Sequence, residues 1–114
     1  MRRVLHCDLT AAARGLLRVP PVARAAVLRA WLAQAQAADR HVRRLRRLHP
    51  AWGDGTLAGR VRQHALPPEP ALNDPEYLAC LALVLEVLRA KSRRHQAARQ
   101  SVPRARRCDR ACVP

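Results

Sequence analysis

Residues 73–88 read NDPEYLACLALVLEVL, and this stretch decides the fold class. Asp74 can accept hydrogen bonds from the first free amides of a helix, and Pro75 suits the first helical position. The apolar residues that follow surround the helix instead of forming one stripe, which is typical of a helix buried on all sides. The run ends at Arg89, well short of the roughly 20 apolar residues that a bilayer span needs. We therefore expect a buried core helix and no membrane association.

An acidic residue within this helix should be poorly tolerated. An unpaired charge in an apolar core costs several kcal/mol, which is a large part of the stability of a small domain. Leu81→Asp or Leu85→Asp is therefore predicted to unfold the protein.

The composition predicts an all-α fold with one core. The chain has 114 residues, of which 49% are hydrophobic, so it can form a single small domain. Ala and Leu dominate and Phe is absent, which favours helices over strands. Three further helical segments are predicted before the core helix, at residues 9–19, 22–48 and 57–65. The prediction is a four-helix domain over residues 1–100, arranged around the buried C-terminal helix.

Short polar residues mark the starts of the predicted helices. Asp8 is placed to cap the first helix and Thr56 to cap the third. The second helix changes from alanine-rich to arginine-rich, so a bend or break near Asp39 is an open alternative to one continuous helix. The core helix is expected to continue as a basic extension to about Gln100.

The charge is strongly positive and uneven. Lys and Arg number 22 against 8 Asp and Glu, and residues 89–114 hold nine of the basic residues and one Asp. Residues 101–114 have little to bury and are predicted to be a disordered, Arg-rich tail. A net charge of +14 indicates attraction to polyanions and says nothing about the fold.

The most suggestive cluster of side chains is the arginine run at residues 40–47. Arg40, Arg43, Arg44 and Arg47 are spaced to share one face of a helix, where guanidinium groups could meet successive phosphates. A solvated face of an Arg-rich protein is the simpler interpretation, and an acidic protein partner is a third. Trp52 follows in the loop AWGDGT (residues 51–56), whose two glycines predict a turn and, as the less common alternative, an anion-binding nest.

The cysteines and the lack of a signal-peptide pattern favour a reducing cytoplasm. Cys80 lies within the core helix, where it should behave as a small apolar residue. Cys108 and Cys112 are a weak signal for zinc, with Cys7 and His6 as conceivable further ligands, and two free thiols are the simpler interpretation. No metal and no cofactor are therefore predicted.

Nothing in the sequence marks an active site. The acidic residues are scattered, and no histidine has a neighbour that would identify it as a general base. The chain has neither a phosphate-binding P-loop nor a dinucleotide fingerprint. We therefore expect a protein that is not an enzyme.

Several stretches resemble a family of short, uncharacterised alphaproteobacterial proteins classed as a domain of unknown function. They are VLHCDLTAAARGLL (residues 4–17), AADR (37–40), HPAWGDGTL (49–57) and LPPEPALNDPEYLACLALVLEVL (66–88). The resemblance covers about residues 4–90 and implies a compact helical domain in the cytoplasm. It carries over no activity and no functional residue.

Two functional hypotheses remain. The first is a small helical interaction protein that binds another protein through Trp52 and the exposed arginines. The alternative is a nucleic-acid-associated protein that contacts phosphates nonspecifically through Arg40, Arg43, Arg44 and Arg47 together with the tail. Salt separates the two, because phosphate contacts weaken steeply as ionic strength rises.

Overall fold

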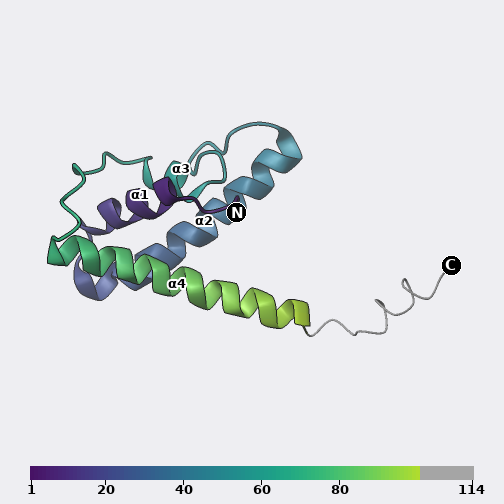
Figure 1. Ribbon diagram of the computed structural model, residues 1–114. Helices are drawn as coiled ribbons and strands as arrows, with labels where there is room; N and C mark the ends of the chain where they lie inside the picture. Colours follow the sequence, from purple (N-terminus) through teal and green to yellow (C-terminus); the bar gives the residue numbers. More distant parts are fainter. Residues whose placement is uncertain (101–114) are drawn as a thin grey trace.

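The computed structural model describes residues 1–100, which form four α-helices and one short 3-10 helix around a single apolar core (Figure 1). The elements in chain order are α1 (His6–Leu16), η1 (Pro21–Ala23), α2 (Arg24–Leu45), α3 (Leu57–Val61) and α4 (Pro75–Gln100). This range contains no β-strand. The predicted all-α, four-helix architecture is confirmed, and the predicted disorder of residues 101–114 lies outside the described residues.

Helix α1 lies at the centre of the packing, between α4 and α3. Ala11, Ala12 and Ala13 are all fully buried, so neighbouring helices approach its backbone closely. A Cβ added to Gly15 would lie 2.8 Å from Cγ1 of Val61 and 3.0 Å from the ring of Trp31. Small residues on α1 therefore allow α2 and α3 to pack on it.

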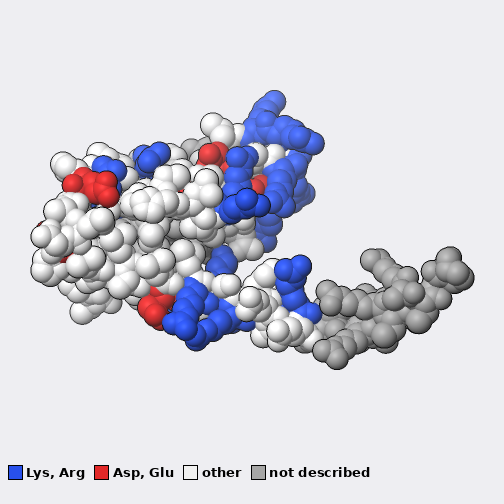
Figure 2. All heavy atoms as spheres, in the orientation of Figure 1, with Lys and Arg blue, Asp and Glu red and all other residues white. Residues whose placement is uncertain are grey.

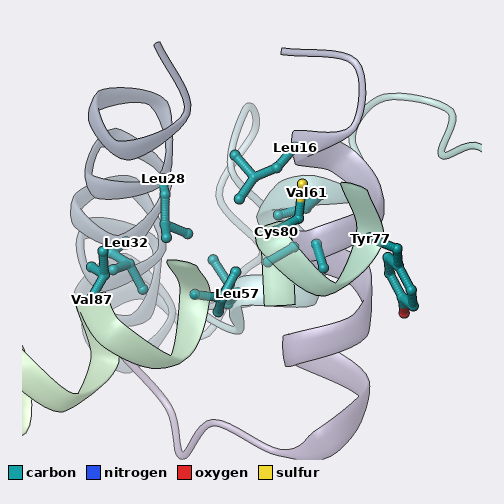
Figure 3. Packing of buried hydrophobic residues seen from close by; sticks show 11 residues of the cluster. Leu16, Leu28, Leu32, Leu57, Val61, Tyr77, Cys80 and Val87 are labelled. Carbon is teal, nitrogen blue, oxygen red and sulfur yellow. The ribbon is translucent and has the colours of Figure 1, made fainter. Parts of the chain in front are cut away.

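Helix α4 is buried on one face only, so the predicted burial on all sides is wrong. Tyr77, Cys80 and Val84 are fully buried, and Cys80 lies beside Leu16 and Val61 in Figure 3. Leu78 and Leu85 are 47% and 53% exposed. The physical reason is that α1 and α2 cover one side of the helix while the other side meets solvent (Figure 1). The predicted unfolding by Leu85→Asp depended on that burial, so this variant is now expected to remain folded.

Both ends of α4 lie where the sequence predicted them. Oδ1 of Asp74 accepts hydrogen bonds from the amides of Glu76 (3.0 Å) and Tyr77 (3.2 Å), as expected for an N-cap. The helix continues past the core to Gln100, and the residues after Leu88 are exposed except for Lys91. This basic extension projects beyond the rest of the domain (Figure 1).

Helix α2 is continuous through Asp39, so the alternative of a break there is excluded. It ends at Leu45, three residues before the predicted end, because Arg46 adopts a left-handed conformation with φ 57°. The turn leaves Leu45 and Leu48 58% and 68% exposed. Both were expected to continue the apolar seam of a longer helix.

Asp8 is not the N-cap of α1 as predicted, because α1 begins at His6, two residues before Asp8. Its carboxylate accepts hydrogen bonds from the amides of Leu5 (2.8 Å) and Ala58 (2.9 Å), and the side chain is almost fully buried. One carboxylate thus lies at the N-terminal ends of both α1 and α3, where the helix dipoles favour negative charge.

Replacing Asp8 with alanine should lower the free energy of unfolding by about 2 kcal/mol, because a buried amide of α3 loses its partner. Asp74→Ala is the matched control, since its carboxylate also accepts from two amides. That cap is only partly buried, so water can replace the carboxylate and the expected loss is about 1 kcal/mol. Urea unfolding measures both values. Equal losses would show that the hydrogen bond from Ala58 to Asp8 adds no stability beyond that of an ordinary N-cap.

Candidate nucleic-acid interface

Five arginines gather where α2 ends and the chain turns, and we call this cluster the arginine tip. Its members are Arg40, Arg43, Arg44, Arg46 and Arg47, all of them exposed. Figure 2 shows the basic atoms as a projection at the upper right, the place where α2 ends in Figure 1.

The arginine tip contains the four arginines predicted from the sequence but in a different arrangement. Arg40, Arg43 and Arg44 lie on the last turns of α2, as expected. Arg47 follows the left-handed residue that ends the helix, so it does not share their helix face. The prediction of one helix face with four arginines is therefore wrong for Arg47.

Only one arginine of the tip has a carboxylate partner. Nη2 of Arg43 lies 3.2 Å from Oδ2 of Asp39, one helical turn earlier. Within residues 1–100, no carboxylate pairs with Arg40, Arg44, Arg46 or Arg47. Four guanidinium groups are therefore left for a negatively charged ligand.

Asp39 anchors the arginine tip to the rest of the domain. The residue is 3% exposed, and the amino group of Met1 (3.4 Å) and Nε of Arg2 (3.9 Å) lie near its carboxylate in addition to Arg43. On the other side, a Cβ added to Gly55 would lie 2.6 Å from Cα of Asp39. The loop after the tip therefore packs directly on the backbone of α2.

An aromatic stack stands beside the arginines. The rings of His49 and Trp52 are parallel within 3°, with centroids 4.6 Å apart. His41, on α2, meets His49 edge-on at 5.0 Å. Trp52, a predicted contact residue, is half-buried, and its ring packs on His49.

Backbone hydrogen bonds fix the His49 ring. Its Nδ1 accepts from the amides of Ala51 (3.1 Å) and Trp52 (3.0 Å). Amide–carbonyl bonds in both directions between His49 and Gly53 close the turn. Because Nδ1 is an acceptor, the neutral ring carries its proton on Nε2, which remains a donor.

An open groove of about 760 Å³ lies along the tip. Its walls are formed by Ala37, Arg40, His41, Arg43, Arg44, Leu45 and His49. The size is in the range of ordinary small-molecule sites. Three arginines and two histidines thus line one space, a combination that can hold an anion together with a flat ring.

His41 and His49 are the residues that the sequence prediction missed. They are eight positions apart, and they meet only because the chain reverses at Arg46. The run HPAW at residues 49–52 offered a partial signal, since a histidine three residues before a tryptophan can fold onto it across a tight turn.

The loop at residues 51–56 is a turn and not an anion-binding nest. The amides of Trp52 and Gly53 bond to His49, and the amide and hydroxyl of Thr56 donate to Oδ1 of Asp54 at 3.0 and 2.6 Å. The hydroxyl bond is the main cause that lowers the pKa of Asp54. Thr56 in turn accepts from the amide of Gly59, which confirms it as the cap of α3.

The remaining candidate groups are less informative. Across residues 1–100, no three His, Cys, Asp or Glu side chains are close enough together to hold a metal ion. Cys7 is exposed, whereas Cys80 is buried, and burial raises the pKa of its thiol. The predicted alternative of zinc at Cys108 and Cys112 falls outside the described residues. In the described part of the chain, no helix is long and apolar enough to cross a membrane.

Comparison with known proteins identifies a family without a known activity. Residues 2–88 match the domain of unknown function DUF7742. Neither the curated proteins nor the solved structures contain a match. The matched residues include the arginine tip, the loop after it and the buried face of α4, and they end where the basic extension of α4 begins. By this match over most of its length, the chain belongs to the DUF7742 family.

Proposed function

We propose that this chain is a non-enzymatic, cytoplasmic protein that binds nucleic acid, with the arginine tip on the phosphates. The observation that supports this most directly is the arginine tip itself, in which only one of five exposed arginines, Arg43, has a carboxylate partner among the described residues. Guanidinium groups bind phosphate oxygens through paired, charge-assisted hydrogen bonds.

A second basic element supports the same proposal. Arg89, Arg93, Arg94 and Arg99 are exposed on the extension of α4. This extension and the arginine tip project toward the same side of the molecule in Figure 1, and both carry blue basic atoms in Figure 2. A polyanion could therefore contact both elements.

Binding of this kind should be largely independent of sequence. Contacts to phosphates position a nucleic acid without reading its bases, and they lose affinity as salt rises because bound counterions are released. We expect strong binding at low ionic strength and a steep loss at moderate ionic strength.

A protein partner, which was the first hypothesis from the sequence, is the second candidate here. The exposed side chains of Leu45 and Leu48 lie among the arginines of the tip. An acidic protein segment with apolar residues would fit such a mixed surface. Its binding would depend on these leucines, whereas phosphate binding would not.

The test is a salt titration of binding to labelled oligonucleotides, measured by fluorescence anisotropy with the full chain. Arg40→Gln combined with Arg44→Gln should weaken binding and reduce the slope of log affinity against log salt by about 1.4 to 1.8, since each of the two lost phosphate contacts contributes about 0.7 to 0.9. The control, Arg18→Gln combined with Arg29→Gln, removes two exposed arginines outside the tip and should leave the slope unchanged.

Two results would contradict the proposal. Absence of binding to DNA and RNA at low salt would exclude nucleic acid as the ligand class. Equal effects of the two double variants would show that net charge, and not the arginine tip, attracts the ligand.

A further inference from the structure

We infer that the groove beside the arginine tip holds an unpaired nucleotide of a single-stranded nucleic acid, with His41 and His49 against the base and the arginines on the phosphate. The inference rests on the proposed function and adds the form of the ligand. It is carried by the placement of both imidazole rings and three arginines around one open groove.

Arginine contacts alone make no distinction between single and double strands, because both have phosphates along their backbones. Aromatic rings do distinguish them. A base within a duplex has its faces covered by its neighbours, whereas an unpaired base can stack on protein rings and be hydrogen-bonded at its edges. Rings in the wall of a basic groove therefore favour the unpaired base.

The ring of His49 is held in place before any ligand arrives. Two backbone amides hold Nδ1, and the indole of Trp52 lies parallel to the ring at 4.6 Å. A ligand that contacts the ring thus orders no free side chain, and the entropy cost of binding is small. The Nε2 proton is not used by these contacts and can be donated to a base or a phosphate oxygen.

Trp52 is a positioning residue in this arrangement. Its indole packs on His49 and is not part of the groove wall. Its contribution to binding is therefore to orient the His49 ring, and the ring contacts with the nucleotide come from the two histidines.

The experiment compares affinities for single-stranded DNA, single-stranded RNA and a duplex of equal length, at the same salt concentration and with the full chain. We expect about tenfold tighter binding of the single strands, in line with the usual contribution of one stacked base. The DNA and RNA arms show which sugar is accepted, and tenfold preference in either supports the inference. Equal or tighter binding of the duplex would overturn it.

Ring variants test the residues. His49→Asn keeps a side-chain acceptor for the amides of Ala51 and Trp52 but removes the ring, and His41→Ala leaves the stack of His49 on Trp52 in place. Each should lower single-strand affinity several-fold with no change in the salt slope or in duplex affinity. His64→Asn, at an exposed position outside the groove wall, is the control and should have no effect. Equal losses for single strand and duplex would overturn the inference.

The unpaired nucleotide in the groove could belong to a strand or be a free mononucleotide, and competition with a nucleoside monophosphate distinguishes the two. As a competitor, it should displace the labelled strand only weakly, because it makes one set of contacts where a strand makes several. Displacement by the mononucleotide as effective as by an unlabelled strand would overturn the assignment to a strand. Failure of the proposed function has a different signature: either no oligonucleotide binds, or the variants of the arginine tip weaken binding no more than Arg18→Gln combined with Arg29→Gln.

Discussion

Val84→Asp should unfold the domain at neutral pH, whereas Leu85→Asp, one position further along the same helix, should leave it folded. Val84 is fully buried in the core, and Leu85 is 53% exposed on the outer side of α4. An unpaired carboxylate at Val84 would cost several kcal/mol, comparable to the total stability of a small domain.

The measurement is a thermal melt followed by helical circular dichroism. The wild type and Leu85→Asp should show similar cooperative transitions, and Val84→Asp should show none or one at a much lower temperature. Since the two variants share charge, residue type and helix, their difference isolates burial. A cooperative melt of Val84→Asp near the wild-type temperature would mean that α4 packs through a different face.

Gly55→Ala should lower the free energy of unfolding by about 3 kcal/mol. The backbone at Gly55 has φ 95°, and a left-handed conformation costs a non-glycine residue roughly 1–2 kcal/mol. In addition, the new Cβ would lie 2.6 Å from Cα and 3.0 Å from N of Asp39, and an overpacked site costs about 1–3 kcal/mol. The backbone of α2 cannot yield as a flexible side chain would.

Gly53→Ala is the matched control, because Gly53 also has a positive φ (83°). Its nearest neighbours, the carbonyl oxygen of Gly59 and Nε2 of Gln63, lie at 3.1 and 3.2 Å from the ideal Cβ. The expected loss is about 1–2 kcal/mol, mainly from the conformation. Chemical denaturation gives both values. Equal losses for Gly53→Ala and Gly55→Ala would show that the contact with Asp39 is not the reason why position 55 requires glycine.

Local signals in the sequence were enough to predict where two of the helices begin. Asp74 and Thr56 cap the helices that they were predicted to cap, because an N-cap depends only on the next three residues. Asp8 was misassigned since its second partner, the amide of Ala58, is 50 positions away. No pattern near Asp8 indicates such a long-range contact.

The burial of α4 could not be predicted from the composition of the helix. Leu78 and Leu85 are as apolar as the residues that pack, but only one side of the helix is covered. The covered face holds the large Tyr77 together with the smaller Cys80 and Val84. Which face packs is therefore decided by a partner helix and not by the helix itself.

The candidate site was predicted in part. Arg40, Arg43 and Arg44 followed from spacing on one helix, and Trp52 followed from its place in the loop. The pairing of His41 with His49 depends on a left-handed arginine at position 46, which sequence rules do not expect outside glycine and asparagine. The groove is a product of that one backbone conformation.

The single carboxylate at the base of the arginine tip places stability and ligand affinity in opposition. The buried carboxylate of Asp39 lies near Arg43, Arg2 and the amino group of Met1. It thereby neutralises positive charge that would otherwise attract phosphate. A neutral residue at position 39 would make the tip more attractive to a polyanion and less firmly attached to the domain. Affinity for nucleic acid and resistance to unfolding therefore cannot both be increased at this residue.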